Sequence, residues 1–387
     1  MAKIIVRGPA LSQSGYGEHC RSVLSALKDT DHDIHLISVG WGETGWVYED
    51  TEERRWIDSL IIKTAQAQES EFDLSIQVQL PSEWQQLAPK NIGITAGVET
   101  TSAPKSWKEA CASMDAVIAP SRHSADSLRT ETSDNIHVIG YGFRASNAKS
   151  KDSLGLELTT EKNFLSVAQW SPRKNIEQTI SSFVQEFMLE DVGLILKLSL
   201  KSGSSIDRHY TLDRIKTFLG AAPPSMKCKV YLLHGSLSNE QMLSLYKNEK
   251  IMGYVTTSHG EGFGLPAFEA ACSSLPIIAP NWGGLTEFTS SGDKVLINEV
   301  DYEVRDLEEY HVWEGVLESD TQWCYPDTVS LRSQMRELYN DTTTANKNAK
   351  KLKTHLAKKF ANKTIKVEYN NVINNVLNNE GETNETE

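Results

Sequence analysis

The stretch from Ser258 to Cys272 holds the residues in this sequence that are best suited to chemistry. Glu261 and Glu269 lie eight positions apart, and a glycine-rich turn follows the first of them. Glycine permits positive φ and a close approach of backbone to ligand, while Pro266 and the alanines after it favour a helix. Exposed N–H groups at such a helix start can seat a diphosphate, and two carboxylates can accept hydrogen bonds from sugar and ribose hydroxyls. The alternative is a tight turn that caps a surface helix, with the glutamates near its positive end.

A second glycine turn follows along the chain. Residues 275–280 are apolar and predict a short buried strand, and residues 281–287 contain Gly283 and Gly284 and open toward a helix. A repeated order of strand, glycine turn and helix is typical of a doubly wound sheet, which binds ligands at the carboxyl ends of its strands.

The run EGFGLPAFE at 261–269, with Gly283-Gly284 and Glu287 after it, resembles the donor site of the family-4 retaining glycosyltransferases, which are group 1 glycosyltransferases. The resemblance implies an α/β protein of the GT-B fold, in which two Rossmann-like doubly wound domains face each other across a cleft. A C-terminal helix is then expected to cross back to the first domain. The implied enzyme is a retaining hexosyl- or pentosyltransferase that moves a sugar from a nucleotide-sugar to an acceptor hydroxyl, with no metal and no cofactor. The acceptor stays open between a glycan, a lipid-linked molecule and a small molecule.

The resemblance also implies roles for single residues. Glu269 is expected to bind the ribose and Glu261 the donor sugar. The backbone of the turn is expected to bind the sugar hydroxyls, through Gly262, Phe263, Gly264 and Leu265.

Two cations, Arg173 and Lys174, follow a predicted strand at 163–168 and precede a predicted helix. A diphosphate leaving group needs fixed cations, because negative charge builds on it as the glycosidic bond breaks. Lys174 matches the lysine of the family, which usually has an arginine five residues earlier, where this chain has Gln169. Arg173 is a candidate for the second cation only because it lies next to Lys174 in the sequence. Which residue supplies the second positive charge stays open. The alternative is a pair of surface charges, although the helix dipole disfavours cations at a helix start.

Gly15, Tyr16 and Gly17 lie in a turn between the predicted strand at 3–8 and a helix with apolar positions at helical spacing. In the family a glycine loop at this place borders the cleft, so these residues are expected to contact the donor. The alternative is a purely structural turn.

Glu99 follows a predicted strand at 91–95 and is followed by Thr100, Pro104 and Trp107. A subset of the family resembles this pattern. Glu99 is therefore expected to contact the transferred sugar or to act near the acceptor hydroxyl, the alternative being a place beside a helix N-cap.

The length of 387 residues indicates two domains. The predicted boundaries are an acceptor-side domain at 1–148, a nucleotide-sugar-binding domain at 149–345, a C-terminal helix at 346–378 and a disordered tail at 379–387. No apolar run is long enough to span a membrane, and the start is too short for a signal peptide. Five scattered cysteines without a C-x-x-C pair indicate reduced thiols in a cytoplasm. The triplet at 29–31 superficially resembles a metal-binding D-x-D but falls in a predicted loop, so no metal site is expected.

The predicted C-terminal helix has a face of lysines with no acidic residue between positions 347 and 366. This face is either solvated or in contact with an anionic surface. The net charge of −13 argues against a large nucleic-acid footprint. Two other functions stay open. One is a GT-B glycosyltransferase that acts on a hydroxylated nucleic-acid base, and the other is a catalytically impaired nucleotide-sugar-binding module marked by Gln169.

Overall fold

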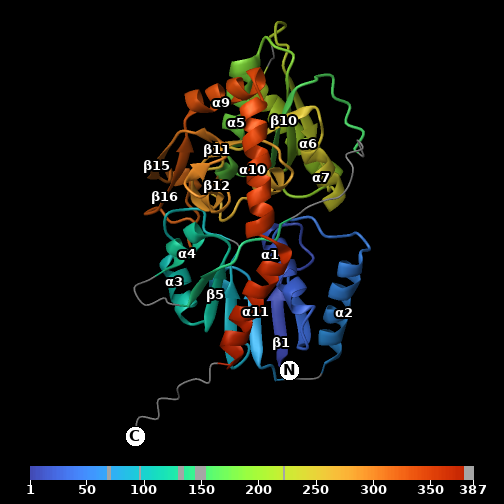
Figure 1. Ribbon diagram of the computed structural model, residues 1–387, viewed down its shortest axis with the longest axis vertical. Coiled ribbons are helices and arrows are strands. Elements are labelled where there is room, and N and C mark those ends of the chain that lie inside the picture. Colours follow the sequence, from blue (N-terminus) through green and yellow to red (C-terminus); the bar gives the residue numbers. More distant parts are fainter. Residues whose placement is uncertain (68–70, 96, 130–134, 144–153, 221–222, 379–387) are drawn as a thin grey trace. The chain divides into compact units, whose positions relative to one another are not determined.

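The computed structural model describes residues 1–67, 71–95, 97–129, 135–143, 154–220 and 223–378. These residues form two compact units (Figure 1). Unit 1 comprises Met1–Gly97, Ala103–Gly142 and the chain from Phe360 onward, and unit 2 comprises Val98–Ser102 and Phe143–Lys359. Each unit is built on one six-stranded parallel sheet with helices packed on it, which confirms the predicted α/β fold with two Rossmann-like halves.

The sheet of unit 1 has the strand order β2-β1-β3-β4-β5-β6. Its strands are β1 (Lys3–Gly8), β2 (Asp33–Ser38), β3 (Leu74–Val78), β4 (Lys90–Ile94), β5 (Ala116–Ala119) and β6 (Ile136–Val138). Ile4, Ile5 and Val6 are at most 1% exposed, as expected for a parallel strand covered on both faces. Because β2 and β3 lie on opposite sides of β1, the strand order reverses between β1 and β3, and the loops there form the usual ligand crevice of a doubly wound sheet.

Three helices of unit 1 start at a polar side chain that caps them. Ser14 accepts a hydrogen bond from Gly17 N at the start of α1, Thr51 caps α2, and Ser121 caps α4. The helices are α1 (Gly15–Leu27), α2 (Glu52–Gln66), α3 (Lys105–Ala112), α4 (Arg122–Leu128) and α11 (Asn362–Asn378), with a 3-10 turn, η1 (Pro81–Glu83).

The sheet of unit 2 has the strand order β14-β11-β10-β7-β8-β9. Its strands are β7 (Asn163–Gln169), β8 (Gly193–Ser199), β9 (Lys229–Leu233), β10 (Ile251–Val255), β11 (Ile277–Pro280) and β14 (Asn298–Val300). The strand order reverses between β7 and β10. The loops that leave the carboxyl ends of these two strands therefore border the expected ligand crevice of unit 2.

The helices of unit 2 cover a core that includes the rings of Phe164, Phe183 and Phe187. They are α5 (Ile176–Phe187), α6 (Ser205–Leu219), α7 (Asn239–Tyr246), α8 (Leu265–Cys272), α9 (Thr328–Asn340) and α10 (Thr343–Lys359), with the 3-10 turns η2 (Pro172–Lys174), η3 (Gly283–Glu287) and η4 (Glu309–His311). Two small antiparallel pairs complete the unit: β12 (Ser290–Ser291) with β13 (Lys294–Val295), and β15 (Tyr302–Asp306) with β16 (Gln322–Pro326).

The prediction of one helix over 346–378 is wrong, because α10 ends at Lys359 and α11 starts at Asn362. Leu356 and Phe360 are buried at helical spacing, but the next buried apolar residue, Ile365, follows after five positions. A single straight helix could not keep all three on one side, so the chain breaks there and each part buries its own stripe. The chain then returns to unit 1, since α10 belongs to unit 2 and α11 to unit 1. Within unit 1, α11 contacts α1 through a hydrogen bond from Asn370 Nδ2 to Ala26 O at 3.3 Å, and its Lys366 pairs at 2.7 Å with Asp29 in the turn after α1.

The predicted domain boundaries differ from the two units in a second place. Residues 98–102 lie in unit 2 although the chain on both sides of them lies in unit 1. The backbone explains this, because Thr101 N donates to Gln322 O (2.9 Å) and Gln322 N donates to Thr101 Oγ1 (3.1 Å). The predicted tail at 379–387 and the predicted boundary between 148 and 149 lie outside the described residues.

No helix in the described ranges is both long and apolar enough to cross a membrane. All five cysteines lie in the described ranges, where each is buried and none forms a disulfide. The cytoplasmic location remains a prediction.

Candidate functional site

The reversal point of the unit 2 sheet brings together the loops that carry the predicted cations and the first glutamate. The 3-10 turn η2 follows β7 and carries Arg173 and Lys174. Asn175 then adopts a left-handed conformation (φ 49°) and starts α5. Glu261 lies on the loop between β10 and α8. The strand order therefore explains why residues almost ninety positions apart (173 and 261) meet at one sheet edge.

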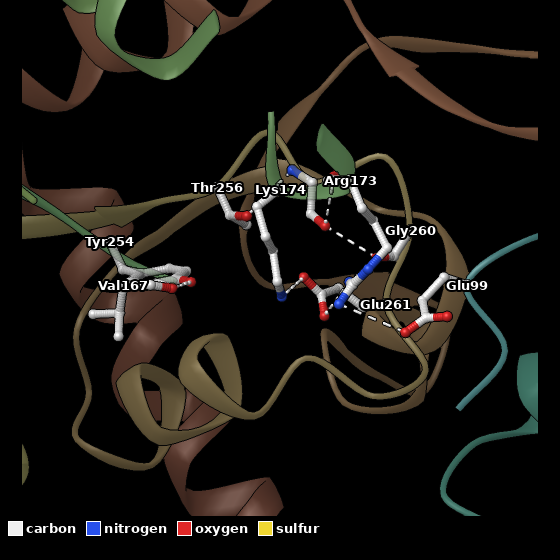
Figure 2. Close-up of polar contacts among 9 residues, drawn as sticks. Glu99, Val167, Arg173, Lys174, Tyr254, Thr256, Gly260 and Glu261 are labelled. Atoms are coloured by element: carbon white, nitrogen blue, oxygen red, sulfur yellow. Dashed lines mark hydrogen bonds and ion pairs between the residues drawn. The ribbon is translucent and has the colours of Figure 1, made fainter. Parts of the chain in front are cut away.

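Both cations contact the same carboxylate (Figure 2). Lys174 Nζ lies 2.5 Å from Glu261 Oε1, and Arg173 Nη1 lies 3.2 Å from Glu261 Oε2. Arg173 Nη1 also donates to Gly260 O at 2.6 Å, and its Nη2 lies 3.6 Å from Glu99 Oε1. Two cations and two carboxylates thus form a compact cluster, and the side chain of each is at most 25% exposed.

The charges in this cluster depend on one another. Burial alone would raise the pKa of Glu261, but Lys174 and Arg173 outweigh it and lower that pKa to about 2. Burial lowers the pKa of Lys174, and the nearby Glu261 offsets part of that effect. Burial also works against the charge on Arg173, but Glu99 and Glu261 raise its pKa above the ordinary value. At neutral pH Glu261 is ionised and Arg173 is charged.

Glycines let the backbone segments around Glu261 approach one another closely. Gly284 N donates to Glu261 O at 2.7 Å, and a Cβ added to Gly284 would lie 2.2 Å from Gly262 O. A Cβ added to Gly260 would lie 1.8 Å from Glu99 O. At Gly260 the close approach is therefore made by another backbone segment of this chain.

The turn ends at Gly264, which has a φ of 89° and is the N-cap residue of α8. Phe263 is 3% exposed, and its ring packs at 5.1 Å from that of Phe268, so only its backbone is available for a ligand. Leu265 is the first residue of α8. The second glutamate, Glu269, lies on the same helix and accepts a hydrogen bond from Tyr246 Oη at 3.2 Å.

His259 supports the site and was not predicted to do so. Its N–H donates to Arg173 O at 2.8 Å, and its Nδ1 donates to Cys324 O at 2.6 Å. The imidazole stacks on Trp323 at 4.7 Å, and burial lowers its pKa to about 4, so it is neutral at pH 7. In the sequence, the position of His259 directly before Gly260 is the one feature that places it near the site. Nothing in the sequence indicates that His259 hydrogen-bonds to both η2 and β16.

Gln169, which replaces the arginine usual in the family, ends β7. It is exposed, and its Nε2 donates to Leu200 O at 3.0 Å. The arginine that contacts Glu261 is Arg173. On the neighbouring strand, Lys197 Nζ donates to Gly235 O at 2.7 Å, and burial lowers the pKa of this lysine to about 8.

The predicted site residues Gly15, Tyr16 and Gly17 lie in unit 1, at the start of α1, whereas the other predicted site residues lie in unit 2. A Cβ added to Gly17 would lie 2.0 Å from Ser12 O, so the fold of its own turn requires a glycine there. A Cβ at Gly15 would meet nothing within 4 Å. The role of these three residues in donor binding stays a prediction.

Glu99 was predicted to belong to the first domain. It lies instead with unit 2, on the segment that pairs with Gln322, and contacts Arg173. Within the described residues no group of three His, Cys, Asp or Glu side chains could hold a metal ion. Asp29, from the triplet at 29–31, lies in a turn after α1 and pairs with Lys366.

The lysines of the C-terminal region divide into paired and unpaired groups. Lys359 pairs with Glu287 at 2.9 Å, and Lys366 pairs with Asp29. Four lysines of α10 are exposed and have no ion-pair partner in the described part of the chain: Lys347, Lys350, Lys351 and Lys358. Contact with an anionic surface remains a prediction.

The fold is that of the GT-B glycosyltransferases. Sucrose-phosphate synthase from Thermosynechococcus elongatus has 15% sequence identity and a TM-score of 0.65, and the match covers 97% of this chain and 99% of that one. Anabaena HepE, solved in complex with UDP and glucose, has 13% identity and a TM-score of 0.64 over 97% of this chain and 100% of that one. At such identities the likeness concerns the fold.

Residues 226–310 match the family model described as glycosyl transferases group 1. The segment contains Glu261, the glycine turn, α8 and Glu269, which confirms the predicted resemblance over this part of the chain. A serotype-specific mannosyltransferase, WbdA from Escherichia coli, is 28% identical over 166 residues, which is 42% of this chain and 19% of WbdA. The chain thus spans less than a fifth of the length of the curated relatives it matches.

Proposed function

We propose that this protein is a retaining glycosyltransferase that moves a hexose or pentose from a nucleotide-sugar to an acceptor hydroxyl. The observation that carries the proposal is the convergence of Lys174 and Arg173 on Glu261 at the reversal point of the unit 2 sheet. The group 1 segment, the mannosyltransferase relative and the neighbour solved with UDP and glucose support it.

In this proposal the donor enters an arrangement of charges that is already balanced. Two cations and two carboxylates have no net charge, so a diphosphate must exchange with Glu261 for the contacts of Lys174 and Arg173. That exchange frees the Glu261 carboxylate to accept hydrogen bonds from the hydroxyls of the donor sugar. Glu269 binds the ribose, and the N–H groups at the start of α8 face the diphosphate.

The chemical step breaks the bond between the anomeric carbon and the diphosphate oxygen, and the bonding electrons go to that oxygen. Lys174 and Arg173 stabilise the charge that builds there. The acceptor oxygen forms the new bond on the same face of the sugar, and its proton goes to the leaving phosphate oxygen. The protein then needs no separate base, and we expect no metal requirement because the two cations neutralise the leaving group. Glu99 keeps Arg173 charged and oriented.

The first test is a thermal-shift screen of the protein with UDP-, GDP-, ADP- and TDP-glucose, the corresponding mannose donors and the free nucleotides. A ligand at about 100 times its Kd should stabilise the protein by about 2.7 kcal/mol. A selective shift that is lost in Glu269→Ala supports the donor site. The absence of a shift with every donor contradicts the proposal.

Turnover of the selected donor then tests the two cations. Lys174→Ala should lower kcat by about 10²–10³-fold and affect donor affinity less, because the charge it stabilises develops in the transition state. Arg173→Ala should also lose turnover, and Lys216→Ala, at an exposed position in the last turn of α6, should not. Unchanged turnover in Lys174→Ala would refute the site. Donor binding without any turnover in the natural sequence would favour the impaired binding module instead.

A further inference from the structure

The hairpin of β15 and β16 in unit 2 has one covered edge and one open edge (Figure 1). The covered edge belongs to β16, where Cys324 N donates to His259 O at 2.9 Å and His259 Nδ1 donates to Cys324 O at 2.6 Å. Thr101 N donates to Gln322 O at 2.9 Å on the same edge. In the part of the chain that the structure describes, β15 pairs with β16 alone. The outer edge of β15 is therefore free to pair with another strand.

The contacts of Cys324 establish which backbone groups of β15 point outward. Val304 lies opposite Cys324 in the antiparallel ladder. Since the N–H and the C=O of Cys324 both contact His259, this is a non-hydrogen-bonded pair, in which the backbone polar groups of the two residues point away from each other. The N–H and C=O of Val304 therefore face the open edge, where no backbone group of the described residues bonds to them. Val304 is also the central residue of the five-residue strand.

The sequence of β15 is complementary to itself in the antiparallel direction. A two-fold axis beside Val304 places this residue opposite the Val304 of a second copy, and the outward groups of the two residues then exchange two hydrogen bonds. In this register Glu303 of each copy lies opposite Arg305 of the other copy. A shift by two residues keeps the hydrogen bonds but places Glu303 opposite Glu303, or Arg305 opposite Arg305, and like charges in opposite positions are destabilising. The charges therefore select the register that is centred on Val304.

The two charged side chains are already ordered within one copy. Glu303 and Arg305 lie on the same face of β15, and Arg305 Nε is 3.6 Å from Glu303 Oε2. The guanidinium carbon of Arg305 lies 4.0 Å from the ring centroid of Tyr325. Both charged side chains are more than half exposed, so a second copy can add its own opposite charges to them without displacing a buried partner.

Exposed apolar side chains gather on the same hairpin. Val304 is 38% exposed, and the segment that leaves β15 carries Tyr310 and Trp313, which are 75% and 64% exposed. The backbone holds Trp313 in place, because Trp313 N donates to Leu317 O at 2.9 Å and Leu317 N donates to Trp313 O at 2.8 Å. Ordered, exposed aromatic residues are enriched in protein–protein interfaces. The open edge thus combines free backbone groups with the side chains of an interface.

We propose that this protein forms a two-fold symmetric dimer in which the β15 strands of two copies pair in antiparallel fashion about Val304. The two hairpins then form one four-stranded sheet, and the open edges cover each other. The self-complementary charges of Glu303 and Arg305 identify the partner as a second copy of this chain. The inference goes beyond the proposed function and does not depend on it.

Sedimentation velocity of the full chain without ligand tests the dimer. We would use about 1–100 μM protein at about 150 mM salt, because the screening length of about 8 Å then weakens repulsion between the acidic residues that follow the strand, Glu308 and Glu309. The natural sequence should sediment as a dimer of the 43.2 kDa chain. A monomer over the whole concentration range overturns the proposal, and so does an open-ended polymer, since a two-fold pair closes.

Charge reversal tests the register. Glu303→Arg and Arg305→Glu each place like charges opposite one another twice in the dimer, so each should raise its Kd about tenfold or more. The double variant with both changes restores opposite charges and should return the Kd to within about threefold of the parent. Glu337→Arg, at an exposed position of α9, is the matched control and should leave the Kd unchanged. Failure of the double variant to recover, or an equal loss in Glu337→Arg, overturns the register.

Val304→Pro tests the backbone pairing without relying on charge. Proline removes the outward N–H of Val304, which the ladder with β16 does not use, so the hairpin should persist. The variant should be a monomer at concentrations where the parent is a dimer, with a melting temperature measured below the dimerisation Kd within about 2 °C of the parent. A Val304→Pro protein that dimerises as the parent does contradicts the proposal. If this variant is unfolded, the recovery in the double charge variant decides.

Discussion

Glu261→Gln removes the carboxylate that Lys174 and Arg173 share, and the structure gives the size of the expected loss. The pKa of Glu261 falls from the ordinary 4.5 to about 2, a difference of about 2.5 units. At 1.36 kcal/mol per unit, the ionised carboxylate stabilises the fold by roughly 3 kcal/mol at neutral pH. The side chain is 12% exposed, so solvent screening reduces this figure little.

The pH dependence follows from the direction of the shift. Because the pKa is lower in the folded state, the stabilisation is fully present above about pH 4.5 and is lost as the pH falls toward about 2. The glutamine variant has no such group. The difference in unfolding free energy between the two proteins should therefore shrink across this range.

Thermal unfolding followed by circular dichroism at pH 7, 5, 4 and 3 measures both effects. For a unit of about 200 residues, roughly 3 kcal/mol corresponds to a fall in Tm of about 6–12 °C at pH 7. Glu337→Gln, at an exposed position of α9, is the matched control and should change stability by less than about 0.5 kcal/mol. A Glu261→Gln protein that melts within about 2 °C of the parent at pH 7, or whose deficit is undiminished at pH 3, would refute this account of the cluster.

Two further predictions concern packing and surface charge. Gly260→Ala places a methyl 1.8 Å from Glu99 O and should cost about 1–3 kcal/mol in chemical denaturation, whereas Gly15→Ala, with no atom within 4 Å, should cost far less; equal losses would contradict the packing argument. If the exposed lysines of α10 contact an anionic surface, the protein should sediment with vesicles that contain phosphatidylserine, and less so at high salt. A variant in which four lysines are replaced by Glu should not sediment with these vesicles; the four are Lys347, Lys350, Lys351 and Lys358. Failure of the natural sequence to sediment contradicts that contact, and salt-sensitive binding to duplex DNA instead would revive the nucleic-acid alternative.

The central stretch could be predicted because its signals are local. Glycines, a proline and alanines specify a turn and a helix start within fifteen residues, and α8 starts where that pattern indicates. The helix α6 was missed because it lacks an apolar stripe: its buried residues are Asp207, Thr211 and Ile215, and its stability comes from tertiary contacts. One such contact is the pair between Asp207 and His234 at 2.7 Å.

The partner of Arg173 could not be predicted from spacing. Glu99 precedes Arg173 by more than seventy positions, and the two meet because Thr101 pairs with Gln322 and because Gly260 admits the Glu99 backbone. Each of these contacts joins residues that are far apart in the sequence, so no periodicity of the sequence predicts it. The sequence therefore identified the chemical groups of the site better than their contacts.

The division of the chain between the units has a consequence for synthesis on the ribosome. Unit 1 contains β1, which precedes every part of unit 2 along the chain, and also α11, which follows unit 2. Its sheet can form early, but the surface of α1 against which α11 packs stays uncovered until all of unit 2 has been made. Residues 98–102 emerge before any other part of unit 2 and wait for β16. The unit that starts first is thus completed last, and no cut at a single point of the chain would release either unit whole.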